Sequence, residues 1–224
     1  FFIIFISSCK ESPSLTPPIE HELFPSKDYV RDNMTGNMIY TEIDTSDFHS
    51  SDNCSQCHPV HVDEWNRSMH AYSMRDPVFF SGWYDERLKN QNTGERFCIQ
   101  CHSPVAYLTG VKLDQYNTVQ DLQNDTELSK SIKEGVTCTV CHSFTGISDE
   151  TVIEDDLAAR AEYYMNPGEG IMYGPLDLET IACEEGMYCH DVKKNDLFQS
   201  SESCLPCHEM TVRGIKVEAT FSEW

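Results

Sequence analysis

The hydrophobic and polar positions along this chain predict short helices separated by loops. We predict helices over residues 60–74, 119–133 and 148–165. Thr118 and Gly135 suit the N-cap and C-cap of the second helix, and Asn166-Pro167-Gly168 ends the third. The alternating pattern of strands is almost absent. The predicted fold class is therefore mainly α with extensive loop.

The N-terminal region has a different composition from the rest. Residues 1–6 form an apolar run that is too short to span a bilayer and is typical of the end of a secretory signal. The order Ile6-Ser7-Ser8-Cys9 resembles a bacterial lipobox, whose cysteine is lipidated; a generic signal peptide with a chance cysteine is the alternative. Residues 10–47 are rich in Pro, Ser, Thr and acidic residues and read as a flexible tether. We therefore predict a signal end over 1–9, a tether over 10–47 and one domain over 48–224, truncated at its C-terminus.

Cysteine carries the strongest chemical signal. The chain has 11 cysteines in 224 residues, and eight of them fall into four copies of one pattern, Cys-x-x-Cys-His. Random placement at this composition would give about 0.02 copies of this motif, which is typical of c-type haem attachment. The four copies are Cys54-Ser-Gln-Cys57-His58, Cys98-Ile-Gln-Cys101-His102, Cys138-Thr-Val-Cys141-His142 and Cys204-Leu-Pro-Cys207-His208.

In this motif the two thiols form thioether bonds to the porphyrin, and the adjacent histidine reaches the iron as its fifth ligand. Zinc is the main alternative, because Cys and His are also its ligands. A ribbon-type zinc site does not need a histidine directly after the second cysteine, so the motifs favour haem. We expect four covalently bound haem c groups in a tetrahaem domain, with His58, His102, His142 and His208 as iron ligands.

Composition and charge narrow the picture further. Only 39% of the residues are hydrophobic, so we expect the haems to be the core. The formal net charge is −21, which excludes nucleic acid as a partner because the phosphates would repel the protein. Two interpretations of the acidic surface stay open: simple solvation, and steering of a basic redox partner.

Each iron also needs a sixth ligand or an open position. Five histidines lie outside the motifs: His21, His49, His61, His70 and His190. His21 lies in the predicted tether, so the candidate distal ligands are His70 and His190, followed by His49 and His61. On one continuous helix His61 and His70 would point in opposite directions, which would let that helix lie between two haems. Met69, Met74 and Met210 are alternative iron ligands.

Cys183 and Cys189 lie outside the four motifs. One interpretation is a stretched haem motif, because His190 follows Cys189. The other, which we favour, is a disulfide that closes a small loop in an exported protein. In that case His190 stays available as a distal ligand.

Several sequence segments together resemble the cytochrome c554-like multihaem family, whose wider relatives include hydroxylamine oxidoreductase and pentahaem nitrite reductase. The resemblance covers residues 53–224. It is carried by the first motif with Trp65-Asn-Arg-Ser68-Met-His70-Ala71 and Asp76-Pro77-Val-Phe79, by Cys101-His102-Ser-Pro104, Gly135-Val-Thr-Cys138 and Gly174-Pro175-Leu176, and by the stretch from His190 to Cys204. The resemblance implies that His70 and His190 are distal haem ligands and that the family continues past residue 224 into another haem motif. The Cys183/Cys189 pair departs from the family pattern.

The resulting functional hypothesis is electron transfer by a multihaem c-type cytochrome with mostly bis-histidine haems. We expect it to be exported to the periplasm or outer cell surface and held at the membrane only through a lipid anchor at Cys9. Its expected partners are other redox proteins of the cell envelope, and a haem wire built from several subunits is a further alternative. The runner-up is the N-terminal part of a nitrite- or hydroxylamine-type oxidoreductase, although the chain has no Cys-x-x-Cys-Lys motif.

Overall fold

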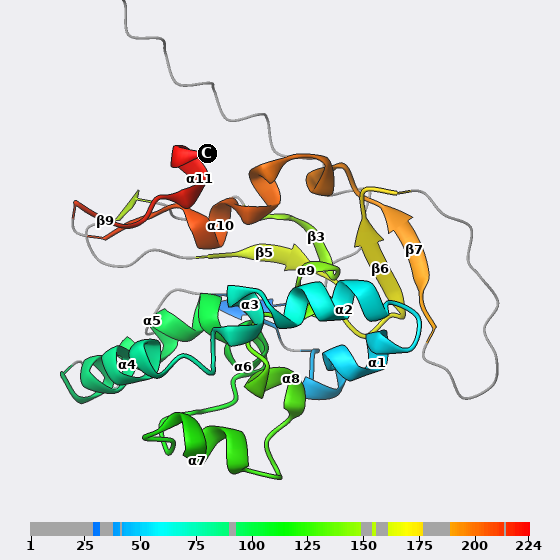
Figure 1. Cartoon of the computed structure of the whole chain (residues 1–224). Helices are drawn as coiled ribbons and strands as arrows, with labels where there is room; N and C mark the ends of the chain where they lie inside the picture. The colour runs from blue at the N-terminus through cyan, green and yellow to red at the C-terminus, as the bar shows by residue number, and fades with distance from the viewer. Residues whose placement is uncertain are drawn as a thin grey trace, which may run out of the picture.

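The computed structural model describes residues 29–31, 38–40, 42–89, 93–148, 154–155, 161–176, 189–212 and 214–224. The α-helices are α1 (Ser51–Ser55), α2 (Pro59–Asn66), α3 (Met69–Tyr72), α4 (Pro77–Lys89), α5 (Thr93–His102), α6 (Pro104–Thr109), α7 (Val119–Asn124), α8 (Lys130–Lys133), α9 (Cys138–Cys141), α10 (Leu205–His208) and α11 (Thr220–Glu223). Short 3₁₀ helices cover Thr45–Asp47, Asp196–Gln199 and Ser201–Cys204. In Figure 1, helices α1–α8 fill one side of the molecule, and most of the strands lie with α10 and α11 on the other.

The strands are short and form small separate sheets. They are β1 (Tyr29–Arg31), β2 (Met38–Tyr40), β3 (Phe144–Ile147), β4 (Glu154–Asp155), β5 (Tyr163–Met165), β6 (Ile171–Gly174), β7 (Asp191–Lys194), β8 (Met210–Val212) and β9 (Ile215–Glu218). β1–β2, β3–β5 and β8–β9 pair antiparallel, whereas β6–β7 and β4–β8 pair parallel. The predicted mainly α class is confirmed. The strands were not predicted, because runs of two to four residues are too short to show an alternating pattern.

The helix predicted over residues 60–74 is interrupted in the structure. α2 ends at Asn66 and α3 begins at Met69, with Ser68 between them as the N-cap. The Ser68 hydroxyl donates to the carbonyl of Trp65 (2.7 Å) and accepts from the amide of Ala71. The Ser68 side chain therefore satisfies a backbone carbonyl at the end of α2 and a backbone amide at the start of α3.

The helix predicted over residues 119–133 is also divided. Its start is as expected, because Thr118 caps α7 in a reciprocal capping box with Asp121. The helix stops at Asn124, where the carboxylate of Asp125 accepts hydrogen bonds from the amides of Glu127 (2.8 Å) and Leu128 (3.1 Å). An aspartate that satisfies the following amides competes with the helical hydrogen bonds.

The prediction of a helix over residues 148–165 is wrong for the residues that the structure describes. Residues 154–155 form β4, and residues 163–165 form β5. β5 pairs antiparallel with β3, and the ring of Tyr163 stacks on Phe144 at a centroid distance of 3.7 Å. Cross-strand aromatic packing, which depends on a distant segment, therefore decides the conformation of this stretch.

The packed domain extends further toward the N-terminus than predicted. The predicted signal end, including Cys9, and most of the tether lie outside the described residues. Within the predicted tether, however, Tyr40 and Ile43 are buried. The Tyr40 hydroxyl donates to the carbonyl of Tyr163 (2.6 Å), so residues before 48 pack onto the domain. None of the helices in the described ranges is long and apolar enough to cross a membrane.

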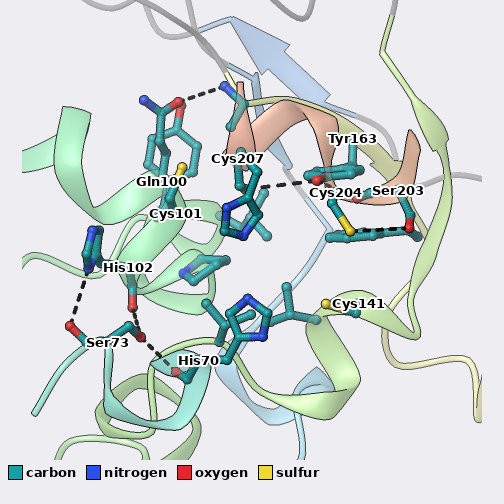
Figure 2. Close-up of a pocket in the computed structure, with 18 of the residues that line it drawn as sticks. His70, Ser73, Gln100, Cys101, His102, Cys141, Tyr163, Ser203, Cys204 and Cys207 are labelled. Atoms are coloured by element: carbon teal, nitrogen blue, oxygen red, sulfur yellow. Dashed lines mark hydrogen bonds between the residues drawn. The ribbon is translucent and has the colours of Figure 1, made fainter. Parts of the chain in front are cut away.

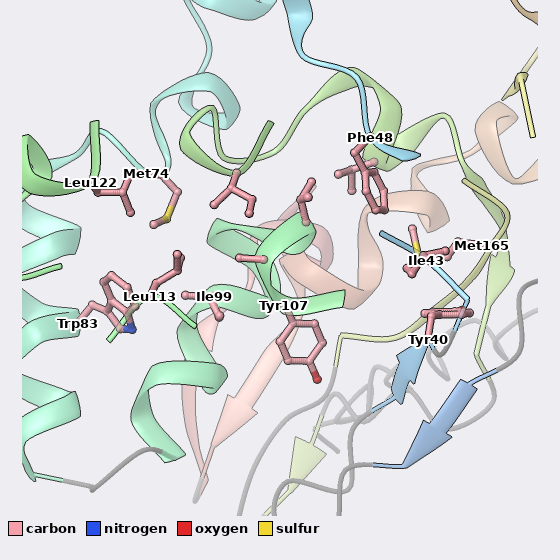
Figure 3. Close-up of a cluster of buried hydrophobic side chains, with 14 of the residues drawn as sticks. Tyr40, Ile43, Phe48, Met74, Trp83, Ile99, Tyr107, Leu113, Leu122 and Met165 are labelled. Atoms are coloured by element: carbon pink, nitrogen blue, oxygen red, sulfur yellow. The ribbon is translucent and has the colours of Figure 1, made fainter. Parts of the chain in front are cut away.

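The polypeptide supplies an apolar core of its own. Figure 3 shows Met74, Trp83, Ile99, Leu113 and Leu122 in one part of this cluster, and each is almost completely buried. Phe48, Ile43, Met165 and Tyr40 lie toward the other side. The expectation that bound groups alone would supply the core therefore needs correction.

A buried carboxylate joins the start of α1 to the end of α8. The side chain of Glu134 is 1% exposed and accepts hydrogen bonds from the amide (3.0 Å) and the hydroxyl (2.9 Å) of Ser51. Its charge faces Lys130 at 3.6 Å, which in turn pairs with Asp52. Because every acceptor is used, the buried charge fastens two segments that are 83 residues apart in the sequence.

Gly135, which follows Glu134, permits a close approach of three backbone segments. Its φ is +83°, and a Cβ at this position would lie 2.0 Å from the Ser73 hydroxyl, 3.0 Å from the carbonyl oxygen of His70 and 3.2 Å from that of His102. The Ser73 hydroxyl lies 2.9 Å from both of these carbonyl oxygens. The amide of Val136 donates a hydrogen bond to the carbonyl oxygen of His70 (3.3 Å). Only glycine provides both this conformation and this space.

We predict that Gly135→Ala destabilises the protein by about 3 kcal/mol or more, because left-handed strain adds to overpacking. Gly110→Ala is the matched control: Gly110 ends α6 with φ +71°, and nothing lies within 4 Å of its ideal Cβ. There we expect only the conformational cost of about 1 kcal/mol. Urea unfolding of identically prepared chains measures both; equal losses would contradict the proposed close approach.

Candidate functional site

Each Cys-x-x-Cys-His motif lies on one turn of helix. The first bridges α1 and α2, the second ends α5, the third forms α9, and the fourth spans the 3₁₀ helix Ser201–Cys204 and α10. In the first motif the amide of His58 donates to the carbonyl of Cys54 (2.8 Å), and His142 repeats this bond with Cys138 (3.0 Å). Residues three apart on a helical turn share a face, so each turn presents its two thiols in one direction.

Two motif histidines are oriented by backbone carbonyls. Nδ1 of His142 lies 2.7 Å from the carbonyl oxygen of Tyr173 on β6, and Nδ1 of His102 lies 3.4 Å from that of Ser73. A proton on Nδ1 that is donated to a carbonyl leaves Nε2 as a free lone pair for a metal. Burial lowers the pKa of both imidazoles, which favours the neutral form that metal ligation requires.

Two pairs of histidines that are distant in the sequence have a ring spacing that would let both imidazoles bind one metal, and the local pair His58–His61 has a similar spacing. The ring centroids of His70 and His208 are 5.9 Å apart, and those of His58 and His190 are 6.2 Å apart. Two imidazoles that bind one metal at about 2.0–2.1 Å per bond have ring centres roughly 6 Å apart. His70 and His190, the two residues singled out by the family resemblance, thus each face a motif histidine.

The other two candidate ligands are placed less specifically. The side chain of His61 is 78% exposed and lies 3.5 Å from Glu64, and its ring lies 6.0 Å from His58, one helical turn away. His49 is partly buried beside the third motif, where its carbonyl accepts a hydrogen bond from Thr139 (3.2 Å). Their roles as ligands stay predictions, and His21 lies outside the described residues.

The histidine of the second motif has a different neighbour. The ring of Phe79 stacks on His102 at a centroid distance of 3.7 Å and an angle of 2°. Among the described residues, no histidine faces His102 as His70 faces His208. A similar but looser stack joins Phe198 to His142 (5.8 Å).

A cavity of about 470 Å³ lies between the second, third and fourth motifs (Figure 2). Its size falls within the range of about 300–1,000 Å³ that is usual for sites of small molecules and cofactors. Its lining includes Cys101, His102, Cys141, His142, Cys204, Cys207 and His208 from the motifs, and His70, Tyr40, Phe144, Tyr163, Met165 and Phe198 around them. Reactive thiols and imidazoles therefore meet an apolar space that suits a flat apolar group.

Two of the motif sulfur atoms lie in surroundings that suit an uncharged thioether. Burial raises the pKa of the Cys98 thiol to about 11 and that of Cys141 to about 12. Zinc sites instead require thiolates that converge on one point. In the described part of the chain, no group of three or more Cys, His, Asp or Glu side chains is arranged to hold a metal ion. The residues therefore fit covalent haem better than zinc.

Thiols of different motifs lie against one another. Cys54 of the first motif lies close enough to Cys138 of the third for each thiol to shift the pKa of the other, and the same holds for Cys101 of the second motif and Cys207 of the fourth. Cys141 of the third motif is close enough to Cys207 for their charges to interact. The four attachment points therefore form one contiguous group.

Cys189 is disulfide-bonded, whereas the eight motif cysteines are free thiols. Its partner lies outside the described residues, as does Cys183. The favoured interpretation of Cys189 as a disulfide cysteine agrees with this finding. The pairing with Cys183 itself stays a prediction.

Three contributors to the site were not found from the sequence: the Tyr173 carbonyl, the Phe198 ring and the carboxylate of Glu218, whose Oε1 lies 3.8 Å from Nδ1 of His208. Each reaches its histidine through tertiary packing. A backbone carbonyl, a phenylalanine and a glutamate have no motif that would have identified them.

Four helical turns carry two thiols and a histidine each, and three of them line an apolar cavity, which is the arrangement expected of a multihaem c-type cytochrome. Residues 53–143 match the family described as cytochrome c554 and c-prime. The fold resembles the crystal structure of a penta-heme cytochrome c552 from Thermochromatium tepidum, with a TM-score of 0.54 and 19% sequence identity over 78% of this chain and 50% of that one. This chain thus spans half the length of that cytochrome. No curated protein matches the sequence.

The family match covers the first three motifs, and the likeness to the solved structure shows a fold similar to that of a multihaem cytochrome, as the resemblance indicated.

We predict that His70→Ala opens one iron coordination position, because His70 faces His208 across 5.9 Å. One haem should become high-spin and bind cyanide or carbon monoxide, as measured by absorption and electron paramagnetic resonance spectra. Tyr72→Ala is the control, since Tyr72 lies on the same helix but does not line the cavity. If the spectra of His70→Ala stay wholly low-spin and unresponsive, His70 is not a ligand.

Proposed function

We propose that the chain is an electron relay that carries four haem c groups, one on each motif, with histidines on both sides of most of the irons. Each haem iron would accept and release one electron by alternating between its ferric and ferrous states. The polypeptide fixes the attachment points, supplies the axial imidazoles and excludes water around them.

The observation that carries this proposal is the contact between thiols of different motifs. Cys54 lies close to Cys138, Cys101 lies close to Cys207, and Cys141 lies near Cys207. This proximity links the first motif to the third, the third to the fourth and the fourth to the second. The proposed attachment order is therefore 1–3–4–2, which would make one continuous path through the domain.

The histidine pairs support conduction rather than catalysis. We assign His70 as the partner of His208 and His190 as the partner of His58, and we keep His49 and His61 as candidates for the remaining positions. An iron held by two imidazoles has no open position for a substrate. Burial lowers the pKa of His70, which keeps this imidazole neutral and able to bind iron.

We further propose that the protein is exported and acts in the cell envelope, with a lipid anchor at Cys9. The apolar run before Cys9 supports this, and so does the disulfide at Cys189, because disulfides persist in oxidising compartments. Its partners would be other envelope redox proteins or further subunits in haem-to-haem contact. The net charge of −21 would steer partners that present a basic surface.

One observation favours a second candidate function, that of the N-terminal part of a nitrite- or hydroxylamine-type oxidoreductase. His102 is stacked against Phe79, and no histidine among the described residues faces it. An iron bound by His102 would then have an open position, which is what a catalytic haem requires.

The deciding experiment is to produce the chain in a host with haem-maturation machinery and to count haems by intact mass and pyridine haemochrome. We expect four haems, and one fewer in each variant in which both cysteines of one motif are changed to Ser. The control is the Cys183→Ser/Cys189→Ser variant, which should keep all four.

Adding cyanide, nitrite or carbon monoxide to the same sample separates the two functions. Unchanged spectra support the relay. A single responsive haem that is lost in the variant without Cys98 and Cys101 supports the oxidoreductase. A chain that binds zinc and no haem contradicts both.

A further inference from the structure

The histidine of the fourth motif has an unusual environment at its second nitrogen. Nδ1 of His208 is buried and has no hydrogen-bond partner among the described residues. The group that faces it is the carboxylate of Glu218, whose Oε1 lies 3.8 Å away. A small closing movement would make this approach a charged hydrogen bond.

At the other oriented histidines of the site, a backbone carbonyl lies near Nδ1. Nδ1 of His142 points to the carbonyl of Tyr173 (2.7 Å), and that of His102 to the carbonyl of Ser73 (3.4 Å). Nδ1 of His190 lies 3.1 Å from the carbonyl oxygen of its neighbour Asp191. Within the described ranges, His208 is thus the one motif histidine with a buried Nδ1 that faces a carboxylate.

The fold holds Glu218 in this position. α10, which ends at His208, leads directly into β8, and β9 returns antiparallel beside it with Met210 opposite Glu218. Oε1 of Glu218 also accepts a hydrogen bond from the amide of Thr220 (2.9 Å), which fixes the carboxylate at the end of β9. Glu218 lines the same cavity as His208 and His70.

We infer that Glu218 is a positioning residue that lowers the reduction potential of the haem attached at Cys204 and Cys207, an inference that rests on the proposed electron relay. A carboxylate at Nδ1 makes the imidazole a stronger electron donor to the metal. Its negative charge also stabilises the ferric state, which carries one more positive charge than the ferrous state. Both effects oppose the gain of an electron at that iron.

This placement matters because the fourth motif is internal in the 1–3–4–2 order. A lower potential there sets an uphill step between the haems of the third and second motifs. Electrons would then rest on the flanking haems and cross the fourth only when a partner drives the transfer. Electrons would be held on the haems on either side of the fourth one and would not be spread evenly over all four.

The test is a redox titration of the haem-loaded Glu218→Gln variant at fixed pH. We expect the equilibrium constant for reduction of one haem to rise about tenfold, equal to about 59 mV for a one-electron couple. The matched control is Glu209→Gln. Glu209 lies in the same hairpin region, but its carboxylate faces Lys216 (3.3 Å) and the amide of Ser222 (2.9 Å) rather than His208.

The His70→Met variant shows which of the haems is affected, because a methionine ligand would raise the reduction potential of the haem that His208 binds. The haem that shifts in Glu218→Gln should be the one that shifts in His70→Met. A second measurement covers the case in which Glu218→Gln does not mature. With Glu218 present, the haem that shifts in His70→Met should start as the lowest of the four.

The outcomes separate this inference from the proposed function. If the unmodified chain carries no haem, the electron relay itself is wrong. If it carries four haems but none shifts in Glu218→Gln, or Glu209→Gln shifts the same haem equally, or a different haem shifts, the role of Glu218 is wrong and the relay stands. A haem at His208 that is not the lowest of the four also contradicts the inference.

Discussion

The site depends on one close contact between backbones, at Gly135. There the carbonyl of His70 accepts from the amide of Val136, and the Ser73 hydroxyl lies between the carbonyls of His70 and His102. The indole of Trp65 adds a hydrogen bond to the Val136 carbonyl (2.8 Å). A candidate distal ligand, the second motif and the approach to the third are thereby held together by groups that are obliged to pair when buried.

The short strands have a distinct role from the helices. The helical turns present thiols, whereas several strands lie beside imidazoles: β6 supplies the Tyr173 carbonyl at His142, β7 begins directly after His190, and β9 ends in Glu218 near His208. Because β6 and β7 pair in parallel, the strand that contacts His142 and the strand that follows His190 belong to the same two-stranded sheet. A two-stranded ribbon needs only a few residues to fix the orientation of a neighbouring imidazole ring. This explains why so little regular sheet is enough here.

Features encoded by neighbouring residues could be predicted from the sequence. The Thr118 cap depends only on residues beside it and was correctly predicted, and each of the four motifs lies on a helical turn that its own few residues can form. The predictions were wrong where contacts with other residues, often distant in the sequence, determine the local conformation. Ser68 divides a helix because it bonds in both directions, and Tyr163 joins a strand because Phe144 lies beside it. Glu218 could not be recognised, because only the β8–β9 pairing brings it to His208.

The contacts between cysteines have a consequence for how the protein must be made. Cys54 and Cys138 are far apart in the sequence, as are Cys101 and Cys207, yet folding brings each pair of thiols together. In an oxidising compartment, adjacent thiols are converted to disulfides. If the protein is exported as proposed, a chain that folded first would cross-link these sulfur atoms. Thioether formation would then have to precede folding, while the chain is still extended and reduced.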